Sequence, residues 1–351
     1  MAFDRAFNTP LILFTAFGGE MISDVPKFTW VGRSNASLGM PTGVSLTNVY
    51  GNGKAFITVG YSSGTYYISY FDFATKTWQQ TFSINGENHI FGGNGVFLWV
   101  YGSSMYSAFN GNDWRYAGYL TARRNPAMCL ASNGTGGVVS CWFVDNPVYA
   151  KGDVSNSGDW TIVGTYDKDG ICCFTSMTCH KGLYVGVASD TVVGSNKGGI
   201  QISTNGYRWV RTLQYPPGYA TDNSCRFGEI RSVGNRLFLQ SNYSYDSGGN
   251  FKYCYRLNVI SDNAASYKTV YDFGTNSFHL ESMVYVAKLG LYILFTKTMI
   301  YSSPDGYSWK AAEKCNFYNA VVRAIYIPGD GFYVSTESDW GSNSTYYCAD
   351  P

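Results

Sequence analysis

Short runs of apolar and aromatic residues recur along the whole chain, and each run ends at a cluster of glycine, asparagine, aspartate or serine. The runs are rich in tyrosine, phenylalanine, valine and isoleucine, which favour strands, and they are too short for core helices. One unit of the pattern predicts four strands, at residues 280–286, 291–296, 299–302 and 308–311. The hydrophobic pattern therefore predicts an all-β fold with tight turns.

Two marks alternate along the chain and give this pattern a period. The first is a tight turn followed by an aromatic or aliphatic run, with its third position at Gly53, Gly95, Gly136, Gly182, Asn235, Gly290 and Gly331. The second is an aromatic residue that opens a strand, at Trp30, Trp78, Trp114, Trp160, Trp209, Tyr267 and Trp309. Spacings of about 40 to 55 residues are typical of four-stranded propeller blades. Residues 25–351 are therefore predicted to form one seven-bladed β-propeller domain of four-stranded blades. Six or eight blades are the alternatives, because Tyr267 replaces a tryptophan.

The two ends of the repeat complete each other. The last turn, at Gly331, has no tryptophan after it, and Trp30 has no such turn before it. We expect an N-terminal strand at residues 28–32 to join the last blade beside a strand at 344–348, because this closure removes exposed strand edges. Residues 1–24 are then a separate N-terminal segment, either an arm packed on the ring or an anchor.

Composition and charge narrow the range of partners. The 351-residue chain has a net charge of +1, which gives no reason to expect nucleic acid as a partner. No apolar run is long enough to cross a membrane, so membrane insertion is not expected.

The nine cysteines lack the spacing of a disulfide framework and fit the role of small buried hydrophobes. Cys172, Cys173, Cys179 and His180 form the only cluster that suggests a metal site. The side chains of adjacent strand residues point to opposite faces, which argues against shared coordination by Cys172 and Cys173. We therefore expect neither a metal nor a cofactor.

The best-preserved copies of the strand–turn–strand unit are Ser303-x-Asp305-Gly306-x-Ser308-Trp309 and Ser203-x-Asn205-Gly206-x-Arg208-Trp209. The Asp or Asn side chain can accept backbone N–H bonds across the turn, and glycine allows a positive φ. Both copies resemble shortened Asp-boxes, the bacterial neuraminidase (BNR) repeats of sialidase-like β-propellers. In that family the box is a structural turn away from the active face, so the resemblance implies architecture rather than activity. Ser303, Asp305, Gly306, Trp309, Ser203, Asn205, Gly206 and Trp209 are the structural residues that it implies.

The richness in glycine, asparagine, serine and tyrosine and the low charge are similar to bacteriophage virion proteins that carry propellers in tails and receptor-binding parts. The resemblance implies a non-enzymatic structural or host-recognition role in the virion. The expected partners are other virion proteins, further copies of the chain, or host surface carbohydrate. The alternatives are a sialidase-like glycan hydrolase and a free carbohydrate-binding lectin.

The resemblance to sialidases also implies what a hydrolase would need, namely arginines for a substrate carboxylate and a tyrosine nucleophile with a glutamate base. Candidates on the predicted innermost strands are Arg123, Arg124, Arg226, Glu229, Arg231, Glu281 and Arg323. The family's Arg-Ile-Pro motif is absent, and no carboxylate pair is fixed by local spacing. The histidines, at 89, 180 and 279, give little material for Ser-His-Asp catalysis and are expected to be surface or satisfied core residues.

Binding is expected on the face opposite the Asp-box turns. Two long loops, at residues 214–219 and 242–250, belong to that face in the predicted topology. They carry Tyr215, Tyr219, Tyr243 and Tyr245, the candidate ligand-binding residues. Tyrosines among serine, glycine and asparagine give amphipathic contact surface at a low entropic cost.

Overall fold

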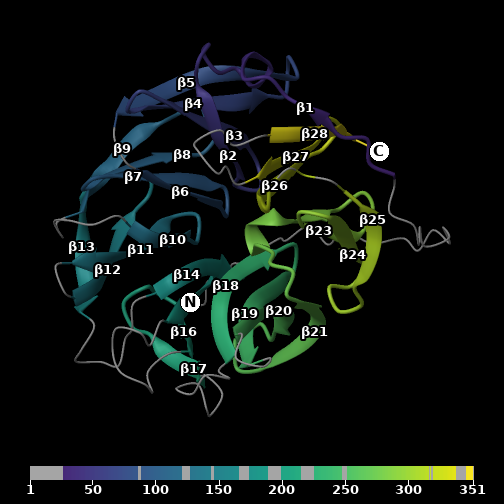
Figure 1. Cartoon of the computed structure of the whole chain (residues 1–351). Helices are drawn as coiled ribbons and strands as arrows, with labels where there is room; N and C mark the ends of the chain where they lie inside the picture. Colours follow the sequence, from purple (N-terminus) through teal and green to yellow (C-terminus); the bar gives the residue numbers. More distant parts are fainter. Residues whose placement is uncertain are drawn as a thin grey trace, which may run out of the picture.

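The chain forms a ring of seven blades, each a four-stranded antiparallel sheet, in a computed structural model of the protein (Figure 1). The structure describes residues 27–85, 88–120, 127–143, 146–165, 174–188, 199–214, 225–246, 251–315, 317, 319–336 and 345–350. The all-β, seven-bladed prediction is confirmed. Among the described residues no helix is long and apolar enough to span a membrane.

In blades one to six the strands run in chain order from the centre of the ring outward, and in blade seven the outermost strand is β1 from the start of the chain. Blade one contains β2 (Ser45–Gly51), β3 (Phe56–Ser62), β4 (Thr65–Asp72) and β5 (Thr77–Asn85); blade two contains β6 (Asn88–Gly93), β7 (Val96–Tyr101), β8 (Ser104–Ala108) and β9 (Arg115–Leu120). Blade three contains β10 (Ala127–Ser132), β11 (Gly136–Phe143), β12 (Asn146–Asp153) and β13 (Asp159–Thr165); blade four contains β14 (Phe174–His180), β15 (Leu183–Ala188), β16 (Gly199–Ser203) and β17 (Val210–Gln214). Blade five contains β18 (Cys225–Val233), β19 (Arg236–Asp246), β20 (Phe251–Ile260) and β21 (Tyr267–Gly274); blade six contains β22 (Met283–Val286), β23 (Leu291–Phe295), β24 (Met299–Ser303) and β25 (Lys310–Lys314). Blade seven contains β26 (Val321–Ile327), β27 (Gly331–Thr336), β28 (Thr345–Ala349) and β1 (Val31–Gly32).

Both sequence marks lie where the repeat predicts. The glycine and asparagine turns join the first strand of each blade to the second, and the seven aromatic residues lie at or just before the outermost strands. One predicted strand is shorter than expected, because residues Leu280–Ser282 form a 3-10 helix ahead of β22. Another 3-10 helix covers Ala36–Leu38.

The ring closes as predicted, but with a shorter strand. β1 pairs antiparallel with β28 through Val31 and Gly32, not through residues 28–32, and the Arg33 N–H donates to the Thr345 carbonyl at 3.1 Å. The preceding aromatic residues pack between blades six and seven instead: Phe28 stacks on Trp30 at 5.7 Å between ring centroids and meets Phe332 edge-on at 5.3 Å. Aromatic packing therefore adds to the short ladder in closing the ring, and β1 lies beside blade seven in Figure 1. The predicted segment 1–24 lies outside the described residues.

The turn between the third and fourth strands of blade six is held by its own side chains. The Ser303 hydroxyl accepts the Gly306 N–H at 2.9 Å, and Asp305 Oδ1 accepts the N–H groups of Tyr307 and Ser308 at 2.7 Å each. Trp309 is buried and donates its indole N–H to the Gly306 carbonyl at 2.8 Å. This geometry is the one that the residue types predict.

The corresponding turn of blade four repeats the arrangement with an amide. Ser203 accepts the Gly206 N–H at 2.8 Å, and Asn205 Oδ1 accepts the N–H groups of Tyr207 and Arg208 at 2.8 and 3.1 Å. Trp209 packs on Phe174 of its own blade with 4.4 Å between ring centroids.

These turns also pack against the preceding blade. A Cβ on Gly306 would lie 3.1 Å from Phe238 of β19, and one on Gly206 would lie 2.8 Å from Val138 of β11. Phe238 in turn meets Trp309 edge-on at 6.2 Å. The turn therefore joins neighbouring blades, and glycine is required there both for a positive φ and for space.

Blade five holds a further copy of this turn that the sequence pattern missed. The Ser261 hydroxyl donates to Asn263 Oδ1 at 2.8 Å, and Asn263 Oδ1 also accepts the Ala265 N–H at 3.2 Å. The position that glycine occupies elsewhere is Ala264, which adopts a left-handed φ of 54°. The strained alanine hides the copy from a search for glycine.

Candidate functional site

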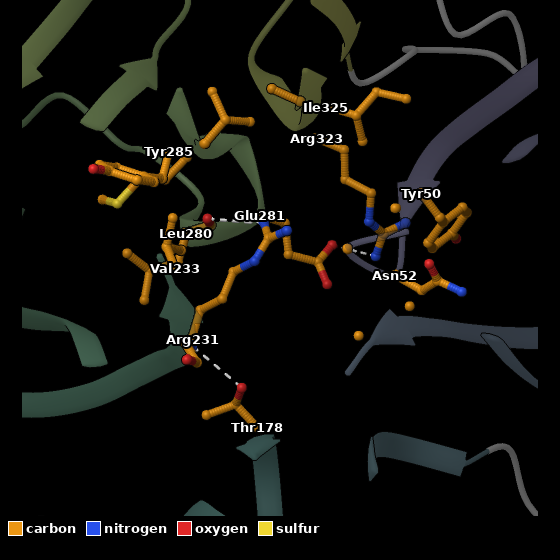
Figure 2. Close-up of a pocket in the computed structure, with 18 of the residues that line it drawn as sticks. Tyr50, Asn52, Thr178, Arg231, Val233, Leu280, Glu281, Tyr285, Arg323 and Ile325 are labelled. Carbon is orange, nitrogen blue, oxygen red and sulfur yellow. Dashed lines mark hydrogen bonds and ion pairs between the residues drawn. The ribbon is translucent and has the colours of Figure 1, made fainter. Parts of the chain in front are cut away.

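A central cavity of about 890 Å³ is lined by the innermost strands of the ring and by the turns that follow them (Figure 2). Five of these turns contribute residues to the cavity lining: Asn52 in blade one, Asn94 in blade two, Gly234 in blade five, Lys288 in blade six and Gly329 in blade seven. Because each is the first turn of its blade, these turns mark one face of the ring. We call this face the first-turn face.

Two arginines from different blades approach one carboxylate in this cavity. Arg323 on β26 forms an ion pair with Glu281, and Figure 2 shows Arg231 on β18 reaching toward Glu281 from the other side. The Arg323 guanidinium also lies over the ring of Tyr50 on β2, 4.1 Å from the centroid. Burial alone would lower the pKa of Arg323, but Glu281, Tyr50 and Glu229 together outweigh it and the pKa is raised. Burial raises the pKa of Tyr50.

The second carboxylate of this region is fully engaged. Glu229 Oε1 lies 2.6 Å from His279 Nδ1, and its Oε2 accepts the Leu280 N–H at 2.6 Å. These contacts connect blade five to the start of blade six. Glu229 therefore orients the 3-10 helix that precedes β22 and places Glu281 in the cavity.

His180 is buried and has a partner on each ring nitrogen. Nδ1 lies 2.8 Å from Ser232 Oγ on β18, and Nε2 lies 3.0 Å from Asp262 Oδ1. Lys181 also pairs with Asp262, at 2.6 Å between Nζ and Oδ2. The side chain is only 1 % exposed, so the group links blades four and five, as expected for a satisfied core histidine.

The suggested metal cluster is only partly described. Cys172 and Cys173 lie outside the described residues, and Cys179 is a buried free thiol. Burial raises the pKa of the Cys179 thiol to about 11, so it stays protonated near neutral pH. Within the described part of the chain, no group of three histidine, cysteine, aspartate or glutamate side chains is placed to hold a metal ion.

The predicted ligand-binding tyrosines are described only in part. Tyr215 and Tyr219 lie outside the described residues, as do Arg123 and Arg124. Tyr243 and Tyr245 lie on β19, which extends to Asp246, so residues 242–246 of the predicted loop belong to a strand and residues 247–250 lie outside the described residues. The residues opposite it, from Phe251 onward, are equally β-prone and complete a hairpin.

Tyr243 lies in a polar group formed by three strands of blade five. Its hydroxyl donates to Asp272 Oδ2 on β21 at 3.1 Å, and the Arg256 guanidinium on β20 lies 3.9 Å from the centre of its ring. Arg256 Nε donates to the same carboxylate at 3.0 Å. Burial, followed by the Cys254 thiol and the Asp272 carboxylate, raises the pKa of Tyr243 to about 12. We call Tyr243, Arg256 and Asp272 the Tyr243 group.

The tip of the same hairpin extends beyond the described parts of the flanking strands β18 and β21. Residues 244–246 pair with residues 251–253, whereas the described pairing of β18 ends at Tyr243 and that of β21 ends at Tyr255. Tyr253 on this tip is 62 % exposed. We call residues 244–246 and 251–253 the ribbon. Sequence reasoning missed Arg256 and Asp272, although both follow from cross-strand register once the strands are known.

Comparisons with known proteins identify the fold. Neither a protein-family model nor a curated protein sequence matches the chain. Among solved structures it is similar to an oligogalacturonate lyase in complex with manganese, with a TM-score of 0.57 and 11 % identity over 92 % of this chain and 96 % of that one. It is also similar to the Pan2 WD40 domain of Neurospora crassa (TM-score 0.55, 8 % identity, 92 % and 96 % covered) and to a streptogramin B lyase (TM-score 0.55, 10 % identity, 92 % and 98 % covered). At such low identity the likeness shows a β-propeller and no activity.

Proposed function

We propose that this chain is a non-enzymatic recognition propeller of a bacteriophage particle, in a tail or receptor-binding part. Blade five makes the contact, through the ribbon and the Tyr243 group, with host-surface glycan or with another virion protein. The observation that carries the proposal is the exposed end of blade five, where Tyr253 lies on one face of the hairpin of β19 and β20 and the Tyr243 group lies on the other. The richness in glycine, asparagine, serine and tyrosine and the low charge support the virion setting.

The chemistry of blade five suits a sugar. Tyrosine rings offer a flat apolar face, and the Arg256–Asp272 pair offers donors and acceptors for hydroxyl groups. The side chains of Arg256 and Asp272 are 38 % and 41 % exposed, so a ligand can reach both. In contrast, Glu229 and Glu281 in the cavity are bound to other groups, which favours binding over hydrolysis.

A glycan array tests the proposal. The wild-type protein is expected to bind a defined set of surface glycans, and Tyr253→Ala and Tyr243→Ala are each expected to weaken binding about tenfold or more. Tyr116→Ala is the matched control, because Tyr116 is 44 % exposed on the outer strand of blade two. If the control weakens binding as much as the blade-five variants, the assignment to blade five is wrong.

The second candidate function is a sialidase-like glycan hydrolase. It is favoured by Tyr50 in the cavity beneath Arg323 and near Glu281, which is the kind of tyrosine, arginine and glutamate set that the sialidase resemblance implies. The raised pKa of Tyr50 works against its use as a nucleophile. Turnover of a sialoside by the wild-type protein that Arg323→Ala abolishes would establish the hydrolase and overturn the non-enzymatic proposal.

A further inference from the structure

We propose that the central cavity binds a small oxyanion, a carboxylate or a phosphate, at Arg231, and that the ligand enters from the first-turn face past Lys54. This site is separate from the ribbon and the Tyr243 group, and it does not depend on the proposed function. The argument rests on the partners of Arg231, the charge of the cavity and its access.

Arg231 uses little of its hydrogen-bonding capacity within the protein. Its Nη1 donates to the Leu280 carbonyl at 3.0 Å, and no carboxylate in the described chain forms an ion pair with it. Burial lowers the pKa of Arg231, and the nearby Glu281 charge only partly offsets this effect. Arg231 thus shares the nearby Glu281 with Arg323 and forms no ion pair of its own among the described residues. A partly desolvated cation in this position is costly, which points to a ligand that supplies further negative charge.

Apart from Lys54, the other charges that line the described cavity are already paired. Arg323 is bound to Glu281, and Lys288 Nζ lies 2.5 Å from Asp350 Oδ1. Glu229 is held by His279 and the Leu280 N–H. The lining thus contains four basic residues, Lys54, Arg231, Lys288 and Arg323, against three acidic ones, Glu229, Glu281 and Asp350. One bound monoanion would balance this excess.

The cavity is accessible from the first-turn face. Lys54 is exposed in the turn of blade one, and its ammonium forms no ion pair with a described residue. Tyr285, 39 % exposed, lines the cavity on the blade-six side. A volume of about 890 Å³ accommodates a small organic acid or a phosphorylated compound. The planar guanidinium suits either oxyanion because it can donate two parallel hydrogen bonds.

Calorimetric titration of the full chain with acetate, glucuronate and inorganic phosphate tests the site, at constant ionic strength set with sodium chloride. The wild-type protein is expected to bind at least one of these anions with one site per chain, and Lys54→Met is expected to weaken that binding. Arg231→Met is expected to weaken it at least tenfold. The pattern across the three anions distinguishes a carboxylate ligand from a phosphate ligand.

The melting temperature of the unliganded variant gives a second readout. Because Arg231→Met removes an unpaired cation, its melting temperature should equal or exceed that of the wild-type protein. If Arg231 only stabilised the fold, Arg231→Met would lower the melting temperature, and the wild-type protein would show no anion binding for the variant to lose. Arg236→Met is the control, because Arg236 lies outside the cavity and contacts the Asp305 carbonyl. Should Arg231→Met not fold, Arg231→Lys keeps the charge and is expected to weaken binding by losing the paired donors. The proposal is overturned if the wild-type protein binds none of the anions, or if binding survives in both Arg231 variants.

Discussion

Replacing Gly306 by alanine tests how the blades are joined. Gly306 has a φ of 79°, a region that costs an L-residue about 1 to 2 kcal/mol, while the loss of glycine's chain entropy returns about 0.5 to 1 kcal/mol. The added Cβ would also lie 3.1 Å from Phe238, a fully buried ring on the preceding blade. Overpacking of this kind costs about 1 to 3 kcal/mol. We therefore expect Gly306→Ala to destabilise the protein by about 1 to 4 kcal/mol.

The matched control is Gly290→Ala. Gly290 has a similar φ of 64°, but a Cβ there would have no neighbour within 4 Å. It should therefore cost only the backbone term, about 1 kcal/mol or less. Urea unfolding followed by tryptophan fluorescence measures both variants against the wild-type protein. Equal midpoint shifts for the two variants would refute the claim that this turn packs on the preceding blade.

Two further predictions concern closure of the ring and pH. Phe28→Ala removes a ring that is 5 % exposed between blades six and seven and should cost about 3 to 5 kcal/mol in urea unfolding, whereas Val31→Ala, at a 50 % exposed position of β1, should stay within about 0.5 kcal/mol. Little effect of Phe28→Ala would mean that the two-residue strand closes the ring by itself. Burial would raise the pKa of Asp305, but the N–H groups of Ser308 and Tyr307 outweigh it and hold the pKa below its usual range. The Asp305 carboxylate therefore stabilises the folded protein at pH values above the usual aspartate pKa of about 4. This stabilisation is lost as the pH falls through the lower pKa that Asp305 has in the folded protein. The stability gap between wild type and Asp305→Asn should close in melts toward pH 3, and a gap that stays constant with pH would contradict this role.

The ring was predictable because its signals are local and repeat. A positive-φ turn selects glycine or asparagine and an inter-blade core position selects tryptophan, so each blade carries both marks. The pattern missed the serine–asparagine turn of blade five because Ala264 adopts the left-handed conformation in place of glycine. The sequence pattern also did not predict the exact extent of β1, because Phe28 and Trp30 pack as aromatic rings instead of pairing in the ladder.

The candidate sites were less predictable because they join residues from distant parts of the chain. Glu229, Arg231, Glu281 and Arg323 were recognised as candidates on innermost strands, but which of them pair depends on the positions of three blades. Tyr243 was identified from its surroundings of serine and asparagine, which also suggested a loop. The structure shows a strand, and only the register of β19, β20 and β21 brings Arg256 and Asp272 to it.

The most direct test of the account is glycan-array binding by the wild-type chain beside the Tyr253→Ala and Tyr116→Ala variants, with sialoside turnover measured on the same preparations. The account predicts selective glycan binding without turnover, with binding lost in Tyr253→Ala and kept in Tyr116→Ala. Turnover of a sialoside, or binding that Tyr253→Ala leaves intact, would contradict it.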